Sequence, residues 1–186
     1  MLSLYSSTTT LPVTLADIKA QLRIEHDAED DHITDLIWAA NDIIEKKLGR
    51  TFVSQTWDYS EAKFCDCHVQ CRCKLFLPYP PLASITHIKY YDPNDTLVTM
   101  DTDDYYTIAT TEDRGFVQPI QYWPATSFYR PNAVQIRFVT GDDVLPTSYV
   151  QLLKIWVTLL FENRSGDINK QENECIDRLE DLLRYC

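Results

Sequence analysis

The spacing of apolar residues near the start of the chain predicts a short first helix. It begins after Thr14 and ends near Arg23, because its apolar residues recur every three or four positions: Leu15, Ile18 and Leu22. Thr14 suits the N-cap position, and Asp17 can reach back to it in a loose version of the capping box. We therefore expect a capped helix at this point.

A longer helix is predicted from about Ala28 to Leu48. Its apolar positions follow spacings of three and four that bury one face: Ile33, Leu36, Ile37, Ala40, Ile43, Ile44 and Leu48. Gly49 stands where a C-capping glycine belongs, after Lys46 and Lys47 at the negative end of the helix dipole. The chain is therefore expected to be helical up to this glycine.

From residue 51 to about residue 140 the chain is rich in strand and turn residues. Tyr, Phe, Trp, Val, Ile and Thr are interrupted by Pro, Asn and Asp. Five strands are expected: Thr56–Phe64, Lys74–Leu77, Ile85–Tyr91, Tyr105–Ala109 and Ala133–Val139. The run DPND at Asp92–Asp95 predicts a turn. The prolines of LPYPP, residues 77–81, exclude a central strand there because each lacks an amide donor.

Helix is predicted again after Pro146, where Thr147 and Ser148 offer capping hydroxyls. The following segment, Val150–Asn163, is apolar on nearly every side and needs cover from its own domain or from another subunit. Its apolar residues are Leu152, Leu153, Ile155, Trp156, Val157, Leu159, Leu160 and Phe161. A last amphipathic segment, Gln171–Tyr185, carries one apolar face: Ile176, Leu179, Leu182 and Leu183.

These elements predict an α+β fold, a helical bundle with a β-rich hairpin insertion in the middle. The bundle has two N-terminal helices and one or two C-terminal helices. We expect a single domain over residues 1–164, with helix at 13–49, a β-rich part at 51–140 and helix at 147–164. A C-terminal arm or helix follows at 165–186. The length of 186 residues suits one domain with a modest core plus a tail.

Composition and charge narrow the possible functions. With 45% hydrophobic and 24% charged residues, the chain is expected to fold rather than to be disordered. Its net charge of -11 opposes binding to nucleic acid through a broad basic surface. No signal peptide is recognised at the start, and Val150–Phe161 is too short for a membrane span and contains Lys154. We expect a soluble protein with no membrane partner.

No pattern of catalytic or cofactor-binding residues is found in the sequence. The chain has only four glycines and contains neither GxGxxG nor GxxxxGK[ST], which argues against a phosphate-binding loop. GxSxG and HExxH are also missing. Because nothing assembles a nucleophile, a base and an oxyanion site, we expect neither an enzyme nor a cofactor.

The segment FCDCHVQCRC concentrates four of the six cysteines. If Val69 is the centre of a three-residue hairpin turn, the sulfur atoms of Cys65, Cys67, Cys71 and Cys73 fall on one face. They can bind zinc, form disulfides or remain thiols, and CxC on a strand suits zinc less well than CxxC knuckles do. A small zinc-stabilised protein-binding module centred on this hairpin is therefore one possible function.

Several stretches, in serial order, resemble the head–tail connector (adaptor) proteins of long-tailed bacteriophages and prophages. They are VTLADIKAQLRI, DDHITDLIWAANDIIEKKLGRTFVSQTW, LFLPYPPLASITHIKYYDPNDT, DYYTI, NAVQIRFVTGDD and LPTSYVQLLKIWVTLLFENR. The resemblance runs from about Val13 to Arg164 and does not include the cysteine segment. The stretch VTGDD departs from relatives that often carry a glycine–aromatic pair after the strand.

This resemblance implies a structural virion protein of the neck, assembled in the host cytoplasm. It implies a homo-oligomeric ring of about a dozen subunits that docks beneath the portal protein and receives the stopper or a tail-completion protein. DNA would pass through the ring without specific binding. Trp156 and Leu160 of the apolar helix are then expected at subunit contacts. The arm residues Ile176, Leu179, Leu182 and Leu183 are expected to grip the portal, with packing on their own domain as the alternative.

Overall fold

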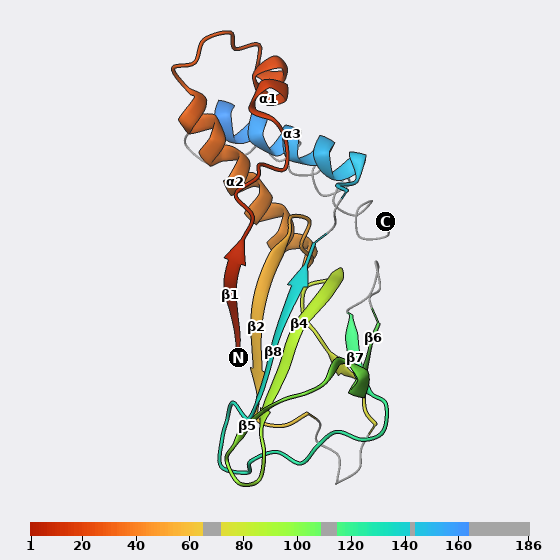
Figure 1. Cartoon of the computed structure of the whole chain (residues 1–186). Helices are drawn as coiled ribbons and strands as arrows, with labels where there is room; N and C mark the ends of the chain where they lie inside the picture. Colours follow the sequence, from red (N-terminus) through yellow and green to blue (C-terminus); the bar gives the residue numbers. More distant parts are fainter. Residues whose placement is uncertain (65–71, 109–114, 142–143, 164–186) are drawn as a thin grey trace. The chain divides into compact units, whose positions relative to one another are not determined.

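A computed structural model of the chain describes residues 1–64, 72–108, 115–141 and 144–163 (Figure 1). The chain forms two compact units. One, which we call the β unit, consists of Met1–Thr8 and Thr51–Asp143; the other, the helical unit, consists of Thr9–Arg50 and Val144–Cys186. The helical segments thus lie before and after the longer β-rich segment in the sequence, and the predicted α+β class is confirmed.

The helical unit contains α1 (Leu15–Leu22), α2 (Asp30–Leu48) and α3 (Thr147–Glu162). Each helix directs its periodic apolar residues into a shared core. The fully buried side chains include Ile18 of α1, Ile33, Ile37 and Ile44 of α2, and Leu152 and Leu153 of α3. None of the helices in the described residues has the length and hydrophobicity that a membrane crossing requires.

Local sequence features account for the start of α1 and the end of α2. The Thr14 hydroxyl accepts a hydrogen bond from the Asp17 amide at 3.1 Å and donates one to the Asp17 carboxylate at 2.6 Å, as predicted. Gly49 ends α2 in the left-handed region, with φ of 67°. The α2 helix starts two residues later than predicted, at Asp30.

The predicted capping of the third helix is wrong. Thr147 and Ser148 lie within α3, Pro146 occupies the cap position, and the Val150 amide donates to the Pro146 carbonyl at 3.1 Å. The helix begins at Thr147, where helix was predicted to start, and no side chain of the described residues caps it.

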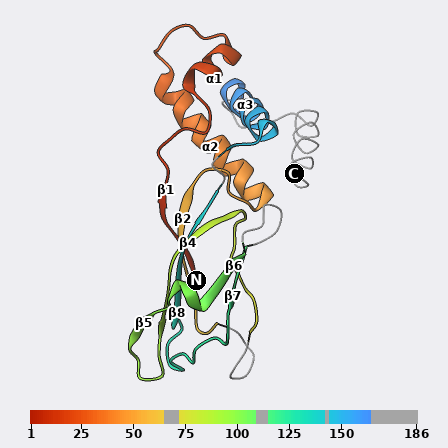
Figure 2. The ribbon, with the colours of Figure 1, turned by 45° about the vertical axis from the view of Figure 1, so that its right-hand side comes forward.

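Two antiparallel sheets build the β unit (Figures 1 and 2). The five-stranded sheet has the order β1 (Leu2–Ser7), β2 (Gln55–Glu61), β8 (Val134–Thr140), β4 (Leu82–Tyr91) and β5 (Leu97–Thr99). The three-stranded sheet has the order β3 (Leu75–Phe76), β7 (Phe116–Pro119) and β6 (Tyr105–Ile108), and a short 3-10 turn, η1 (Thr102–Asp104), leads into β6.

A core shared by the two sheets holds the β unit together. The five-stranded sheet contributes Leu82, Ile88, Val134, Ile136 and Phe138, and the three-stranded sheet contributes Leu75, Tyr105 and Val117. Gly115 lies where the small sheet meets β4, because a Cβ added there would stand 2.3 Å from the Leu82 Cβ. Side chains alternate along each strand, so the neighbouring residues form an outer face on each sheet.

All five predicted strands are present, but three strands were not expected. The predicted strands correspond to β2, β3, β4, β6 and β8, and the DPND run forms the β4–β5 turn, in which the Asp92 carboxylate accepts from the Asn94 and Thr96 amides at 2.9 and 2.8 Å. The unexpected strands are β1, β5 and β7. They are short or rich in serine, so their local patterns are weak; β1 pairs with the distant strand β2, whereas β5 and β7 pair with the strands that precede them.

Candidate functional site

The predicted cysteine hairpin lies mostly outside the described residues. Cys65, Cys67 and Cys71 are not among them, whereas Cys73 is half-buried against the core of the β unit. The Cys73 carbonyl accepts a hydrogen bond from the Trp123 indole Nε1 at 2.8 Å, and the Trp123 ring stacks on Phe64 with centroids 4.4 Å apart. Among the described residues, no group of three or more His, Cys, Asp and Glu side chains could hold a metal ion.

Of the six residues predicted to contact the portal or a neighbouring subunit, only Trp156 and Leu160 are among the described residues. Ile176, Leu179, Leu182 and Leu183 lie outside the described residues. Trp156 is buried in the helical unit, where the Lys47 ammonium lies 5.0 Å from its ring centroid. Leu160 is half-buried, as are Ile155, Leu159 and Phe161, so α3 retains partly accessible apolar surface near its C-terminal end.

Buried polar groups in the helical unit were missed by the sequence analysis. Asn41 and Glu45 lie on the buried side of α2, and the Tyr149 hydroxyl of α3 donates a hydrogen bond to Asn41 Oδ1. Burial, reinforced by the negative charge of Glu45, raises the pKa of Tyr149 above its ordinary value. The spacing itself contained the signal, because Asn41 stands four residues after Ile37 and three before Ile44.

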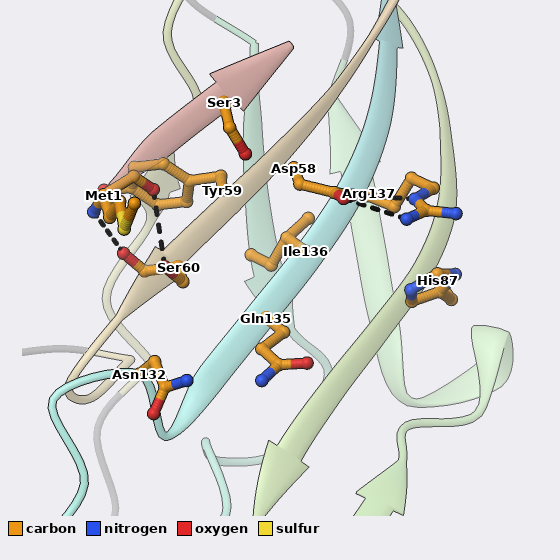
Figure 3. Close-up of a pocket in the computed structure, with 10 residues that line it drawn as sticks. All are labelled: Met1, Ser3, Asp58, Tyr59, Ser60, His87, Asn132, Gln135, Ile136 and Arg137. Carbon is orange, nitrogen blue, oxygen red and sulfur yellow. Dashed lines mark hydrogen bonds and ion pairs between the residues drawn. The ribbon is translucent and has the colours of Figure 1, made fainter. Parts of the chain in front are cut away.

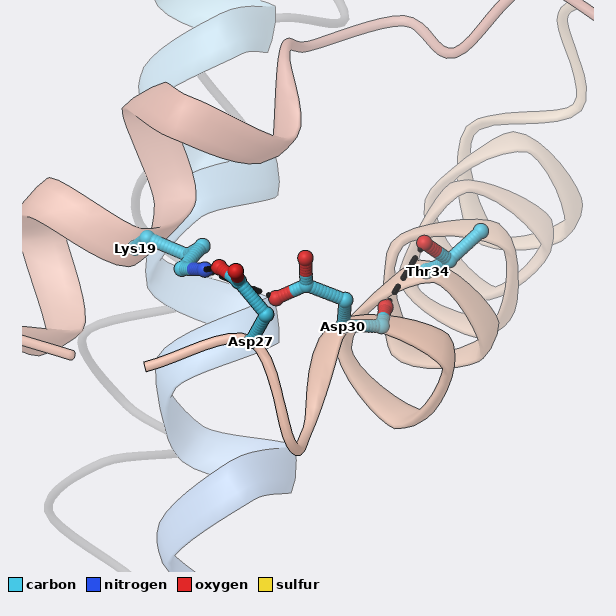
Figure 4. A network of polar contacts seen from close by, with 4 residues as sticks. All are labelled: Lys19, Asp27, Asp30 and Thr34. Carbon is cyan, nitrogen blue, oxygen red and sulfur yellow. Dashed lines mark hydrogen bonds and ion pairs between the residues drawn. The ribbon is translucent and has the colours of Figure 1, made fainter. Parts of the chain in front are cut away.

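The acidic segment between α1 and α2 is tied to α1 by one lysine (Figure 4). Lys19 Nζ lies 2.6 Å from Asp27 Oδ1 and 2.8 Å from Asp30 Oδ1, and the Thr34 hydroxyl donates to the Asp30 carbonyl at 2.8 Å. The hydrogen bond from Lys19 lowers the pKa of Asp27. These carboxylates therefore fix the connection between two helices.

The outer face of the five-stranded sheet is polar (Figure 3). Arg137 of β8 makes a bidentate ion pair with Asp58 of β2, at 2.7 and 2.8 Å, and the Tyr5 ring centroid lies 3.5 Å from the Arg137 guanidinium carbon. The hydrogen bonds from Arg137 lower the pKa of Asp58. Asp58 and Arg137 thus neutralise each other across two neighbouring strands.

A shallow hollow of about 210 Å³ lies on the same face. Its lining includes Ser3, Asp58, His87 and Gln135, and each of the four residues belongs to a different strand. Figure 3 shows these side chains together with Arg137. Burial, followed by the charges of Lys89 and Arg137, lowers the pKa of His87. A neutral histidine beside a carboxylate that is held by arginine provides no activated nucleophile.

The outer face of the three-stranded sheet is apolar. Phe116 of β7 lies directly opposite Phe76 of β3 on one side and Ile108 of β6 on the other, so the three side chains form one row across the sheet. Phe76 is 52% exposed, Ile108 is 41% exposed, and Tyr106 on the same face is 54% exposed. The Lys74 ammonium lies 4.2 Å from the Phe116 ring centroid.

Comparison with known proteins agrees with the predicted resemblance. Residues 12–70 match the family model described as phage gp6-like head-tail connector protein. The predicted resemblance to head–tail connectors is confirmed. No curated protein matches the sequence.

Chains in solved structures of gene transfer agent particles share the fold over almost the whole chain. A chain in the virion of a native gene transfer agent particle is 16% identical, with a TM-score of 0.75, covering 96% of this chain and 94% of that one. A chain in the neck of an empty gene transfer agent particle, computed with C6 symmetry, is 18% identical with a TM-score of 0.71 and the same coverage. A chain in the native neck, computed with C12 symmetry, is 16% identical with a TM-score of 0.69, over 95% and 94%.

The match to the connector family covers α1, α2 and β2 and stops before the three-stranded sheet. The sheet that carries Phe76, Ile108 and Phe116 therefore lies outside the matched segment. The sequence analysis assigned β3 and β6 to strands but missed this apolar face, because β7 was not predicted. The aromatic residues Phe76 and Phe116, each next to a buried aliphatic residue, were the available signal.

Proposed function

We propose that this chain is a structural subunit of a phage-like virion neck, a ring-forming head–tail connector. The observation that carries the proposal is the likeness of its fold, over 96% of its length, to a chain of a gene transfer agent virion. The match of residues 12–70 to the connector family supports the same role. The description of that family names a structural role, a connector between head and tail. Within the part of the chain that the structure covers, no arrangement of side chains argues for catalysis.

The proposed ring contains about a dozen copies of the chain. Two similar chains belong to necks computed with C6 and C12 symmetry, and a closed ring of identical subunits is the usual outcome of such cyclic symmetry. The net charge of -11 suits a ring through which DNA passes, because it disfavours tight contacts with phosphate. The partly accessible apolar surface of α3 near Leu160 is available for neck contacts.

Contacts with the portal protein and with a stopper or tail-completion protein are part of the proposal. The arm over residues 165–186 is the proposed portal contact, with Ile176, Leu179, Leu182 and Leu183 as its apolar face. Its support is the amphipathic spacing together with the family resemblance. The zinc-stabilised module has no comparable support, since the comparisons point to connectors.

Removal of the gene from a producing phage or prophage tests the connector role. We expect DNA-filled heads and separate tails, and the wild-type gene supplied in trans should restore tailed particles. Electron microscopy of purified particles provides the measurement. Normal tailed particles in the absence of the chain would contradict the proposal.

Truncation of the arm tests the portal contact separately. Deletion of residues 176–186 should weaken binding to the purified portal protein by about tenfold or more, because a terminal apolar face is removed. The circular dichroism spectrum and the unfolding midpoint should stay unchanged. A matched variant with Ile176→Ser and Leu183→Ser should behave like the truncation. Unchanged portal binding by both variants would refute the portal role of the arm.

A further inference from the structure

We propose that the outer face of the three-stranded sheet docks into an acidic hollow on the β unit of a second copy of this chain, and that this contact joins neighbouring subunits. The inference rests on the proposed ring and adds to it the two surfaces that meet. The docking surface consists of Lys74, Phe76, Tyr106, Ile108 and Phe116. The receiving surface is a hollow formed by the β4–β5 hairpin, η1 and the segment after β7.

The docking surface is held in shape by strand pairing and by the core beneath it. Leu75, Val117 and Tyr105 point into the shared core, so the alternate residues Phe76, Phe116 and Tyr106 are directed outward. The ammonium group of Lys74 is placed over the Phe116 ring and brings one positive charge to the apolar row. Aromatic residues are enriched in the buried cores of protein interfaces, and a lysine at the edge of such a row suits the charged rim around a core.

The receiving hollow combines apolar walls with an acidic rim. It encloses about 420 Å³ and is lined by Tyr90, Val98, Met100, Tyr122 and Pro124, together with Asp101, Asp103 and Asp104. The Asp101 carboxylate accepts from the Asp103 amide, and the Ile120 amide donates to the Asp104 carbonyl at 2.9 Å, so the rim is fixed by η1. A hollow of this volume admits an aromatic side chain, and its carboxylates attract a cation beside that ring.

One chain cannot fill its own hollow with its own docking surface. Asp104 lies immediately before β6 and Ile120 immediately after β7, so the hollow is at one end of this hairpin. Ile108 and Phe116 are at the opposite end of the same paired strands. The occupant must therefore come from another molecule. Because the two surfaces are different, their contact is head-to-tail, which is the type of contact that generates rings.

Charge favours a second copy of this chain as that occupant. Copies with a net charge of -11 repel one another, so a contact between them needs a local attraction. The exposed Lys74 supplies positive charge on one surface, and three aspartates supply negative charge on the other. Each copy carries both surfaces, so every subunit of a ring can use both.

Charge reversal on the purified full-length chain tests this contact. Self-association is measured by sedimentation velocity from about 1 to 300 µM, a range that spans ordinary subunit affinities. We expect Lys74→Glu and Asp103→Lys each to weaken association at least about tenfold, and the double variant to recover most of it. Asp103 is chosen because its side chain does not cap η1, so the rim stays intact. Phe76→Ser should weaken association without affecting the fold measured by circular dichroism.

The control is Lys89→Glu, which makes the same charge change on the outer face of the five-stranded sheet and should leave association unchanged. If wild-type chain assembles and Lys74→Glu assembles equally well, the proposed contact is wrong while the ring and the connector role stand. If single variants weaken association and the double variant does not recover it, the pairing of these two surfaces is overturned. A wild-type chain that stays monomeric throughout the range also overturns the contact, and the connector role is then judged by the particle experiment above.

Discussion

On the five-stranded sheet the outward positions of β2 and β8 carry Asp58 and Arg137, which neutralise each other across the strands. On the three-stranded sheet the outward positions carry Phe76, Phe116 and Ile108, which lie side by side and remain accessible to solvent. Both faces follow the same two-residue alternation over the same core. They differ only in the residue types that the alternation presents.

The difference shows which sheet face is complete within one chain. Cross-strand ion pairs keep charged groups solvated and partnered, so a polar face needs no further cover. A contiguous apolar face has no such compensation within the described residues, and surfaces of this kind mark contacts between proteins. Location in a sheet alone therefore does not distinguish the two faces; the register that groups the outward residues does.

The largest effect is expected from Gly115→Ala, which disturbs the packing of the three-stranded sheet, the sheet that carries the apolar face, against β4. The new Cβ would lie 2.3 Å from the Leu82 Cβ, so the three-stranded sheet must shift against β4. We expect a loss of about 1 to 3 kcal/mol in the free energy of unfolding, measured by urea denaturation. Thr107→Ala, on an exposed residue of the same sheet, is the control and should change it by less than about 0.5 kcal/mol. An unaltered midpoint for the glycine variant would show that the sheets are not packed as described.

A large effect on association with little effect on stability is expected from Phe76→Ser combined with Ile108→Ser. The variant replaces two of the three residues of the row, and both are already partly exposed, so folding loses little buried area. Self-association should fall by about tenfold or more in sedimentation experiments. Gln135→Ser on the polar outer face is the matched control. If the double variant and the Gln135→Ser control self-associate equally well, the apolar face contributes no more to association than the polar face does.

A smaller effect, on stability alone, is expected from Asp58→Asn. Arg137 lowers the pKa of Asp58 in the folded chain, so the ionised carboxylate stabilises the fold above its unfolded-state pKa of about 3.8. This contribution is lost as the pH falls through the lower folded-state pKa. Because both side chains are partly exposed to water, the variant should lose less than about 1 kcal/mol at pH 7, and this loss should shrink as the pH falls below about 3.8. Thermal unfolding at neutral and acidic pH gives the measurement, and a loss of the same size at both pH values would show that the ion pair is not its source.

The smallest effect is expected from His87→Gln. Burial and the neighbouring cations lower the pKa of His87 in the folded chain below its ordinary 6.5, so the unfolded chain binds the proton more readily. Stability should therefore fall as the pH drops below about 6.5 and level off below the folded-state pKa. The glutamine variant should remove this pH dependence, so that the difference in the free energy of unfolding between pH 5 and 7.5 shrinks by a few tenths of a kcal/mol. Urea titrations at the two pH values measure this difference. Identical slopes would show that another group titrates in this range.

The helices could be read from the sequence because their determinants are local. The Thr14–Asp17 cap, the apolar stripe of α2 and Gly49 involve residues only a few positions apart. The start of α3 was predicted at the right residue, but its cap was misjudged, since the hydroxyls of Thr147 and Ser148 suggested a cap although Pro146 takes that position. Asn41 and Glu45 were overlooked because polarity suggested exposure, whereas a tyrosine from α3 provides Asn41 with a hydrogen bond.

The sequence by itself determined the helices, the five longer or more apolar strands and the resemblance to head–tail connectors, because these depend on periodicity, caps and the serial order of short stretches. Only the tertiary structure decided that Phe76, Phe116 and Ile108 form one row and that Asp58 meets Arg137. Phe76 and Phe116, and Asp58 and Arg137, come from strands far apart in the chain, and a register shift of one residue would reverse the faces of a strand. Strand pairing is non-local, so the surface that we propose as the subunit contact cannot be read along the chain.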